Sequence, residues 1–387
     1  MSEPTHVTPE ENKETQATEG FKCPSCGGMT VFDPKDQAMK CEYCQAEYPV
    51  EPLKGTITEK DFFSVDESAN QDWGGVTRVF KCSNCGGETV LEGNSVSSRC
   101  AFCGSPNVVS IDQLPGIKPE SVLPFKVGKS DAIERFKVWI GKRFWAPRAL
   151  KKDHTMDKNI KGVYIPHWTY DSQTYSTYSG MAGNYYYETQ TFTVMVNGRP
   201  QMQTRQVQKI HWFPVSGDYS RFFDDVLIND STNIDQTIMT NIQPFDLTQL
   251  QIYNPKFLAG FSAERYAKGV KAIWEKAKDI IRMGIRSDIN AIILRRADVV
   301  GTININTSYN DVTYKHMLLP VWISAYTFRG KLFNFYINGQ TGEVQGRSPV
   351  SFWKVLAAVL IGLAVIGLII WFVQMNGGFE YSGGAYY

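Results

Sequence analysis

The chain has 387 residues, of which 43% are hydrophobic and 20% are charged, and its formal net charge is +1. This length accommodates two or three domains with buried cores. A nearly neutral chain has no global field that would draw it to nucleic acid or to an anionic surface, so charge alone favours neither partner. The abundant aromatic residues favour β-structure in the middle of the chain.

The N-terminal leader and the cysteines indicate a reducing compartment. Residues 1–20 (MSEPTHVTPEENKETQATEG) have no apolar core and no basic start, so we interpret them as a disordered leader and not as a signal peptide. All eight cysteines lie before residue 104. We therefore expect thiolates in the cytosol and not a secreted disulfide framework.

An internal repeat defines two small modules. Residues 21–50 and 80–109 both begin with Phe-Lys-Cys-x-x-Cys-Gly-Gly-x-Thr-Val, and both place a second Cys-x-x-Cys pair after the same gap. Equal spacing indicates two copies of one folding unit. We assign zinc ribbon 1 to residues 21–52, a linker to residues 53–79 and zinc ribbon 2 to residues 80–110.

The cysteine spacing predicts two structural zinc ions. A Cys-x-x-Cys turn presents two sulfurs, and two such turns complete the tetrahedral shell that Zn²⁺ prefers. Four thiolates leave no position for water or substrate, so we expect the zinc to stabilise the modules and not to catalyse. Disulfides, an iron–sulfur centre and a redox Cys-x-x-Cys are alternatives that the duplicated spacing disfavours. The predicted ligands are Cys23, Cys26, Cys41 and Cys44 in ribbon 1, and Cys82, Cys85, Cys100 and Cys103 in ribbon 2.

Charge distinguishes between two kinds of partner for the ribbons. Ribbon 1 has a net charge of −2 and ribbon 2 is neutral. Phosphate contacts need a positive surface, which neither ribbon offers. We therefore predict modules that bind other proteins. A membrane-tethered nucleic-acid-binding protein is the alternative, and steeply salt-dependent retention on DNA or RNA would favour it.

Residues 111–350 predict a central α+β domain. One helix is expected from Ser130 to about Trp145-Ala146-Pro147. A stronger helix is expected after Ser262, because apolar residues recur there at intervals of three and four, namely Tyr266, Val270, Ile273, Ala277 and Ile280. The expected β-structure comprises strands at 163–178, 293–305, 312–328 and 331–337, and a hairpin at 185–213 with its turn at Asn197-Gly198.

A further likeness indicates a duplicated unit inside this domain. The same order of motifs occurs twice, each time as a short Pro-Phe motif, a helix and a motif that ends in Trp. The first copy has Leu123-Pro124-Phe125 and Ile165-Pro166-His167-Trp168, and the second has Gln243-Pro244-Phe245 and Leu319-Pro320-Val321-Trp322. The segments between these motifs differ in length. A single α+β unit and a duplicated one therefore both remain open.

The chain shows no motif for catalysis. Phosphate loops, nucleophile elbows and dinucleotide fingerprints are all missing from the sequence. Tyr185, Tyr186 and Tyr187 are expected to pack within a strand, with a sticky sheet edge as the alternative. We expect no enzyme, although a pocket that joined histidines to carboxylates would argue otherwise. The histidines considered are His154, His167, His211 and His316.

A C-terminal apolar segment predicts one transmembrane helix within residues 351–375. Residues 355–373 (VLAAVLIGLAVIGLIIWFV) contain no charge and span about 28 Å as a helix, close to the hydrocarbon thickness of a bilayer. Arg347 and Lys354 precede the span, whereas the tail at 376–387 has neither Lys nor Arg. The positive-inside rule then places the N-terminal domains in the cytoplasm and the tail outside the cell membrane.

Four features carry a resemblance to a known family: the double ribbon, the stretch IPHWTYDSQTYSTYSG, the stretch LFNFYINGQTGEVQGRSPVS and the apolar span. Through these features the chain resembles a bacterial family with transcription factor IIB-type zinc ribbons. The resemblance covers most of residues 21–375 and assigns only the eight cysteines, as zinc ligands. Some members are implicated in envelope-stress systems, where they help to recruit phage-shock-type and band-7-type proteins to the bilayer. The resemblance therefore implies a membrane-anchored adaptor for membrane-associated proteins, with no small-molecule substrate.

Overall fold

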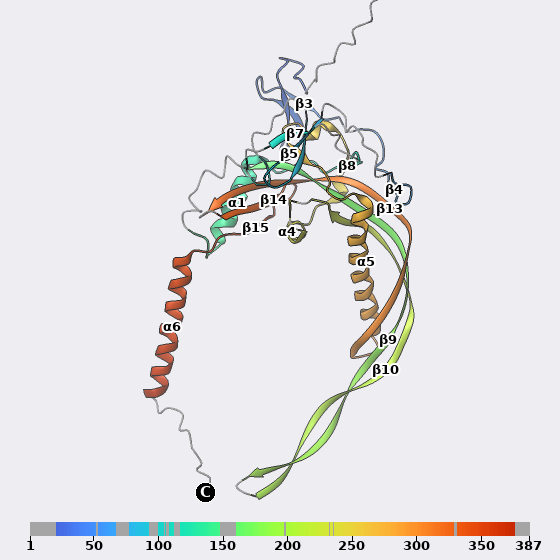
Figure 1. Ribbon diagram of the computed structural model, residues 1–387, viewed down its shortest axis with the longest axis vertical. Coiled ribbons are helices and arrows are strands. Elements are labelled where there is room, and N and C mark those ends of the chain that lie inside the picture. Colours follow the sequence, from blue (N-terminus) through green and yellow to red (C-terminus); the bar gives the residue numbers. More distant parts are fainter. Residues whose placement is uncertain are drawn as a thin grey trace, which may run out of the picture.

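The computed structural model describes residues 21–51, 53–66, 77–92, 100–103, 105, 108–111, 117–147, 160–196, 199–231, 233–234, 236–328 and 331–375. Two small β regions that carry the cysteines lie at one end of a sheet-rich body, and an apolar helix leaves that body, as Figure 1 shows. The expected multidomain α+β layout is confirmed. The predicted leader at 1–20 and tail at 376–387 lie outside the described residues.

The described strands form two sheets. The smaller sheet holds, in order, β1 (Thr30–Asp33), β2 (Ala38–Cys41) and β3 (Glu47–Pro49). The larger sheet follows the path β11-β8-β13-β9-β12-β6-β5-β7, with β10 beside β9, β4 and β14 beside β13, and β15 beside β14. Its strands are β4 (Lys60–Asp61), β5 (Thr77–Cys82), β6 (Glu88–Glu92), β7 (Val108–Ile111), β8 (Ser121–Val122), β9 (Lys161–Val196), β10 (Arg199–Asn229), β11 (Gln251–Ile252), β12 (Ser262–Glu264), β13 (Val299–Phe328), β14 (Lys331–Asn338) and β15 (Val344–Gly346).

The helical elements lie beside this sheet, except the C-terminal helix, which leaves the body. They are α1 (Lys129–Lys142), α4 (Gln236–Asn241), α5 (Val270–Ile293), α6 (Phe352–Met375), and the 3₁₀ turns η1 (Leu247–Gln249) and η2 (Pro255–Leu258). The first predicted helix is confirmed as α1, but Gly128 and not Ser130 occupies its N-cap position, and the helix ends at Lys142 rather than at about residues 145–147. The buried face of α1 consists of Ala132, Phe136 and Ile140, which recur every four residues.

β9 is the central strand of the larger sheet. It pairs antiparallel with β13 from Lys161 to Gly183 and with β10 from His167 to Val196. The predicted strand at 163–178 and the predicted hairpin at 185–213 are therefore parts of one long hairpin. Beyond Gly183 no third strand joins it among the described residues, and it projects from the body as a two-stranded arm (Figure 1). The predicted turn at 197–198 lies outside the described residues.

The two halves of the body are built alike around the β9–β13 pair. Ile165 lies opposite Leu319 at the centre of that pair. β8 runs parallel to β13 and leads through Gly128 into α1, while β12 runs parallel to β9 and leads through Gly269 into α5. Each half then continues into a hairpin, β9–β10 in one and β13–β14 in the other, and the first hairpin is much longer.

This arrangement corrects part of the internal likeness expected from the sequence. Residues 165–168 and 319–322 occupy equivalent positions in the two central strands. The segment equivalent to Ser121–Val122 is Ser262–Ala263, because both pairs run parallel to the opposite central strand. Residues 243–245, which the sequence likeness matched to residues 123–125, lie instead between α4 and η1. Two segments are equivalent when they pair in the same register with the opposite central strand. A short sequence likeness around one proline does not reveal that register.

α5 differs from the predicted second helix at both ends. Ser262 lies in β12, and the helix begins only after Gly269, whose φ of +84° is a left-handed conformation that favours glycine. The helix continues to Ile293, so the next strand begins at Val299 rather than at 293. That strand, β13, joins the two strands predicted at 293–305 and 312–328 into one, with a shift of register between Asn310 and Thr313.

The buried face of α5 also differs from the prediction in its second half. Val270, Ile273 and Ala277 are buried as expected, but Ile280 is 41% exposed and Ile281 is fully buried in its place. The pattern then repeats every four residues to the end of the helix. Its buried residues pack against β9, β10 and β13 as the core of the second half, and they include Ile281, Ile285, Ile289 and Ile293.

The buried carboxylate of Asp230 determines where α5 begins. It accepts hydrogen bonds from Lys268 N at 3.0 Å, from Gly269 N at 3.0 Å and from Trp168 Nε1 at 2.9 Å. N–H groups at a helix start have no acceptor within the helix, and a negative charge there is favourable. Asp230 lies 39 residues before Gly269, so no local sequence signal marks this cap.

Part of the predicted linker is held against the sheet. We call residues 57–66 the strap. Within it β4 pairs with β13, and Phe62 N donates a hydrogen bond to Val312 O at 3.0 Å. The Phe62 ring is buried and contacts Tyr170 and Trp274 at centroid distances of 6.3 and 5.5 Å. The strap therefore fixes one point of the chain between the two ribbons.

Removal of the Asp230 carboxylate is expected to destabilise the protein. Asp230→Ala leaves an indole N–H and two backbone N–H groups without their acceptor, which costs about 2–4 kcal/mol in the free energy of unfolding. Asp230→Asn keeps one acceptor oxygen and is expected to cost about half as much. Chemical denaturation of the detergent-solubilised protein measures both changes. Equal stability of Asp230→Ala and wild type would contradict the assigned role.

Candidate metal centre

The Cys-x-x-Cys turns are built alike. In the first turn Gly27 N donates to Cys23 O at 2.8 Å, and Cys23 N donates to Gly28 O at 2.7 Å. The same two bonds recur around Cys82 with the glycines that follow it. Gly27 and Gly86 have φ values of +72° and +75°, which glycine adopts without strain. The repeated sequence therefore produces a repeated local geometry.

The eight predicted ligands come together in two sets of four. Within each set, the four Sγ atoms all lie within 4.8 Å of one another. Four sulfurs at about 2.3 Å from a tetrahedral Zn²⁺ lie about 3.8 Å from each other, and the observed separations are close to that value. These sites hold two structural zinc ions. The Sγ–Sγ distances are 3.5 Å for Cys23–Cys44, 3.5 Å for Cys26–Cys41, 3.7 Å for Cys82–Cys103 and 3.6 Å for Cys85–Cys100.

The surroundings of the sulfurs differ between the two ribbons. In ribbon 1 the hydroxyl of Tyr48 lies 3.4 Å from Cys23 Sγ, and this hydrogen bond lowers the pKa of the Cys23 thiol to about 6. In ribbon 2 burial raises the pKa of Cys100 to about 11. Zinc binds thiolates and displaces their protons. Each ribbon nevertheless combines thiols of both kinds, because the pKa of Cys44 in ribbon 1 is raised to about 12 and the pKa of Cys103 in ribbon 2 is lowered to about 7. Both ribbons must therefore release protons when zinc binds.

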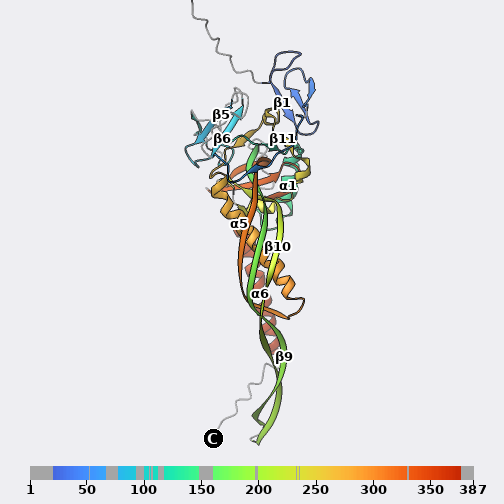
Figure 2. The same ribbon diagram turned by 90° about the vertical axis from the view of Figure 1, so that its right-hand side faces the viewer.

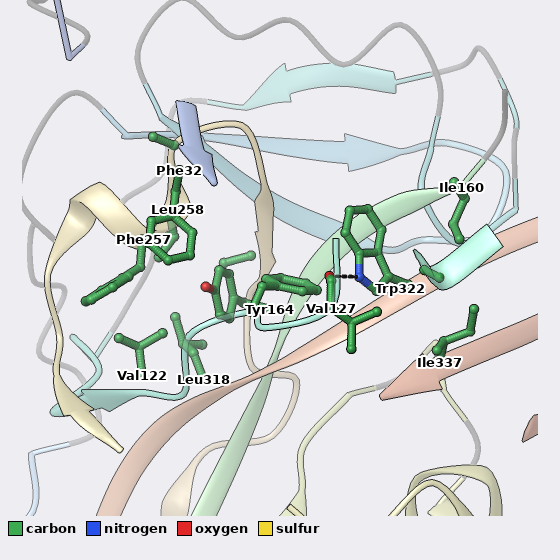
Figure 3. Packing of buried hydrophobic residues seen from close by; sticks show 14 of the residues in the cluster. Phe32, Val122, Val127, Ile160, Tyr164, Phe257, Leu258, Leu318, Trp322 and Ile337 are labelled. Atoms are coloured by element: carbon green, nitrogen blue, oxygen red, sulfur yellow. Dashed lines mark hydrogen bonds between the residues drawn. The ribbon is translucent and has the colours of Figure 1, made fainter. Parts of the chain in front are cut away.

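Ribbon 1 is packed against the body. Phe32 N donates to Ala259 O at 3.0 Å, and the Phe32 ring meets Phe257 edge-on at 5.1 Å. Figure 3 shows Phe32, Phe257 and Tyr164 in one buried cluster, together with the bond of 2.8 Å from Trp322 Nε1 to Val127 O. The ribbon thus contributes a side chain to the core of the first half.

Ribbon 2 is joined to the body by both a sheet and a core. β6 pairs antiparallel with β12, which itself pairs with β9. Arg265 bonds Glu88 across this junction at 3.1 Å. The buried ligands Cys82 and Cys100 belong to the same hydrophobic cluster as Ile165. The second zinc site therefore shares its packing with the centre of the fold.

A charged cluster that sequence reasoning missed lies where the strap meets β9, β10 and β13. Lys315 Nζ lies 2.7 Å from Asp225 Oδ1 and 3.1 Å from Glu59 Oε1. Asp171 is buried, accepts a hydrogen bond from Asp225 N at 2.7 Å and shares another with Glu59. Burial, with Glu59 beside it, raises the pKa of Asp171 to about 7. The cluster thus holds a proton near neutral pH.

In this cluster a lysine side chain balances the negative charge of the carboxylates. Asp171, Asp224 and Asp225 bring carboxylate oxygens within 4.8 Å of one another, a spacing found in cation sites. Here the ammonium group of Lys315 supplies the positive charge. The participants come from segments far apart in the sequence, such as Glu59 and Lys315, 256 residues apart, so no local motif could have revealed them.

The structure brings together two of the histidines singled out in the sequence. His167 and His316 are fully buried in β9 and β13, and burial lowers their pKa values to about 4 and about 3. The His316 ring stacks on Trp168 at 4.4 Å. His211 lies on the projecting arm, away from this pair, and His154 lies outside the described residues. The two buried rings are therefore neutral members of the core.

The predicted apolar span forms a helix on the outside of the body. Residues Phe352–Phe372 of α6 have a mean hydropathy of 2.9, and none of this segment is buried in the protein. By length and composition this helix could cross a membrane. The predicted span at 355–373 lies entirely within α6.

Sequence comparison finds similarity to the uncharacterized protein YdjG of Bacillus subtilis (strain 168). The two sequences are 26% identical over 370 residues, which cover 93% of this chain and 99% of YdjG. No family model matches the chain. No solved structure matches it either. The similarity thus extends along nearly the whole of both chains and brings no activity or partner with it.

Each cysteine cluster is expected to bind one zinc ion. The purified protein should contain about two Zn²⁺ per chain, and Cys82→Ser/Cys85→Ser about one, because hydroxyls replace two of the four thiolates in ribbon 2. Ser83→Ala, in the same turn, is the control and should retain both ions. Metal analysis by mass spectrometry measures the content. Wild-type protein that contains no zinc, or contains cystines, would contradict the assignment.

The proton held by Asp171 predicts a dependence of stability on pH. Its folded pKa of about 7 lies above the usual value of 3.8, so between these values the folded state binds more protons than the unfolded state. Its contribution to stability therefore falls as pH rises through this window. Asp171→Asn cannot ionise and should become more stable relative to wild type between about pH 5 and about pH 8. Denaturation curves at both pH values measure this change.

The exposed neighbour Asp224 provides the control for this experiment. Asp224→Asn removes a carboxylate from the same cluster without touching the buried one. Its difference from wild type should stay nearly constant over the same interval. If the free energy of unfolding of Asp171→Asn also differed from wild type by a constant amount over this interval, the proton held by Asp171 would not affect stability.

Proposed function

We propose that this protein is a non-enzymatic, membrane-anchored adaptor whose ribbons and central domain present docking surfaces to other proteins. The two zinc sites support this because four thiolates close each one and leave no position for a substrate. Both ribbons also pack on the body, which supports a single presented surface. In this proposal zinc maintains the shape of that surface.

The observation that carries the proposal is the end of the β9–β10 hairpin, residues 184–211, which we call the arm. Beyond Gly183 its two strands pair, among the residues that the structure describes, only with each other. A two-stranded hairpin alone is marginally stable in water, and its open edges can accept a further strand. A long arm of this kind fits a protein partner and offers no enclosed cavity to a small substrate.

The side chains of the arm favour the same interpretation. Tyr185, Tyr186 and Tyr187 are 44%, 46% and 64% exposed, so they do not pack within the protein as the sequence had indicated. Met195 and Met202 are 69% and 79% exposed. Tyrosine and methionine are enriched at protein interfaces, where a partner covers such side chains. The alternative of a sticky edge therefore fits the observed exposure.

α6 supplies the anchor in this proposal. Arg347 and Lys354 precede the span, which favours a single-pass topology with the ribbons and body in the cytoplasm and the tail outside. Partners confined to the same membrane meet an anchored protein at a raised effective concentration, so weak contacts suffice. We infer a role in the recruitment of membrane-associated proteins, as in the envelope-stress systems of the family that the sequence resembles.

Shortening of the arm is expected to abolish partner binding. Tyr185 lies directly opposite Ile210, so an Asn-Gly turn in place of residues 186–209 closes the hairpin in register. Crosslinking in intact membranes, followed by affinity capture, measures the recovery of partners. Recovery should fall about tenfold or more, which corresponds to about 1.4 kcal/mol or more of lost binding free energy.

Point variants provide a matched comparison for the shortened arm. Tyr186→Ser/Tyr187→Ser removes exposed aromatic rings and should reduce recovery, whereas Thr189→Ser/Thr191→Ser changes exposed polar residues of the same strand and should not. Zinc content, measured in parallel, shows that each variant is folded. Unchanged recovery of the same partners with the shortened arm would contradict the proposal.

A further inference from the structure

Two segments that are far apart in the sequence form one basic and aromatic surface at the start of α6. Residues 137–147 (KVWIGKRFWAP) follow from the second half of α1 into the loop after it. Residues 347–354 (RSPVSFWK) lead into α6. Both segments combine Lys or Arg with Phe or Trp, and neither contains Asp or Glu. The same unusual composition therefore occurs twice at one place in the fold.

Hydrogen bonds hold the loop Arg143–Ala146 against the first turn of α6. Ser351 N donates to Trp145 O at 2.8 Å. Lys354 Nζ donates to Phe144 O at 2.6 Å and to Ala146 O at 2.9 Å. The Lys354 ammonium group also lies 5.3 Å from the centre of the Phe144 ring. The loop is thus fixed where α6 leaves the body.

The aromatic side chains at this place point into solvent. Phe144 and Trp145 of the loop are 69% and 43% exposed, and Phe352 and Trp353 of α6 are 61% and 70% exposed. An exposed apolar patch with a polar rim marks an interaction surface. Aromatic rings at the ends of a membrane span lie at the level of the lipid headgroups, and nearby Lys and Arg attract anionic lipids.

We propose that the loop Arg143–Ala146 binds the headgroup region of an anionic bilayer beside the point where α6 enters it. Phe144 and Trp145 insert among the headgroups, and Lys142 and Arg143 contact lipid phosphates. This inference rests on the membrane anchor proposed above and extends it, because the body itself and not α6 alone contacts lipid. The bilayer is the favoured occupant because the loop is hydrogen-bonded to the start of the span.

In the structure α6 and the arm extend the same way, as both views show (Figures 1 and 2). A two-stranded arm with open edges and polar side chains cannot lie in hydrocarbon. A bilayer around α6 therefore requires this helix to turn relative to the arm. Ser351 precedes the first residue of α6, so in this proposal its bond to Trp145 O is retained when the helix turns and keeps the loop at the headgroups.

Site-specific photocrosslinking in the full-length protein tests this contact. The photoreactive residue p-benzoylphenylalanine replaces Phe144, Phe352 or Phe63 in protein reconstituted into nanodiscs of phosphatidylcholine and phosphatidylglycerol. Phe352 reports on the anchor, and Phe63, 72% exposed on the strap, reports the background. Lipid adducts at position 144 should approach the yield at position 352 and exceed that at position 63 by about tenfold. Mass spectrometry identifies the adducts.

The charge dependence distinguishes an anionic surface from a merely apolar one. Lys142→Gln/Arg143→Gln should lower the adduct yield at position 144 by about threefold or more and leave position 352 unchanged. Equal yields at position 144 in nanodiscs with and without phosphatidylglycerol would overturn the preference for anionic lipid.

The outcomes separate this inference from the proposed anchor. Lipid adducts at position 352, with only background at position 144, would overturn the loop contact and leave the anchor intact. Adducts at position 144 to a second copy of this chain, in place of lipid, would also overturn it. Background levels at both positions 144 and 352 would overturn the anchor and the loop contact together.

Discussion

The backbone pairing of β9 is the constraint on which the rest of the structure depends. This single strand of 36 residues pairs with β12 near its start and with β13 from Lys161 to Gly183, and it continues with β10 into the projecting arm. Ribbon 2 reaches it through β6 and β12, and the strap reaches its partner β13 through β4. A metal site at one end of the molecule and an open surface at the other are therefore joined by one continuous hydrogen-bonded sheet.

Zinc takes part in this arrangement as a component of the core. Cys82 and Cys100 pack in the same cluster as Ile165, the residue at the centre of the β9–β13 pair. Metal binding to thiolates releases free energy that a small module uses for folding, and here that module shares its packing with the body. Ribbon 1 is attached differently, through Phe32 and the hydrogen bond of 2.7 Å from Gln37 Nε2 to Phe125 O.

Features that depend on neighbouring residues could be predicted from the sequence. The cysteine spacing predicted the ligand sets and the apolar run predicted α6, because each pattern is complete within a short stretch of chain. Features set by distant contacts could not. Asp230 caps α5 from 39 residues away, so the helix was expected from Ser262. β9 also runs through residues 179–184, which lie between the predicted strand and the predicted hairpin. There Gly180 lies close to Ile303 of β13 and Gly183 lies close to Ile210 of β10, and a Cβ atom would obstruct both approaches.

Hydrogen exchange of the full-length protein before and after zinc chelation tests the central claim most directly, because it reports on every part of the sheet at once. If β9 connects the second zinc site to the body, chelation should accelerate exchange in β5 and β6 and also in β12 and the start of β9, near Val163. The arm, which is open in either state, should change little. Acceleration confined to residues 21–52 and 80–110 would show that the ribbons fold independently and would contradict this account.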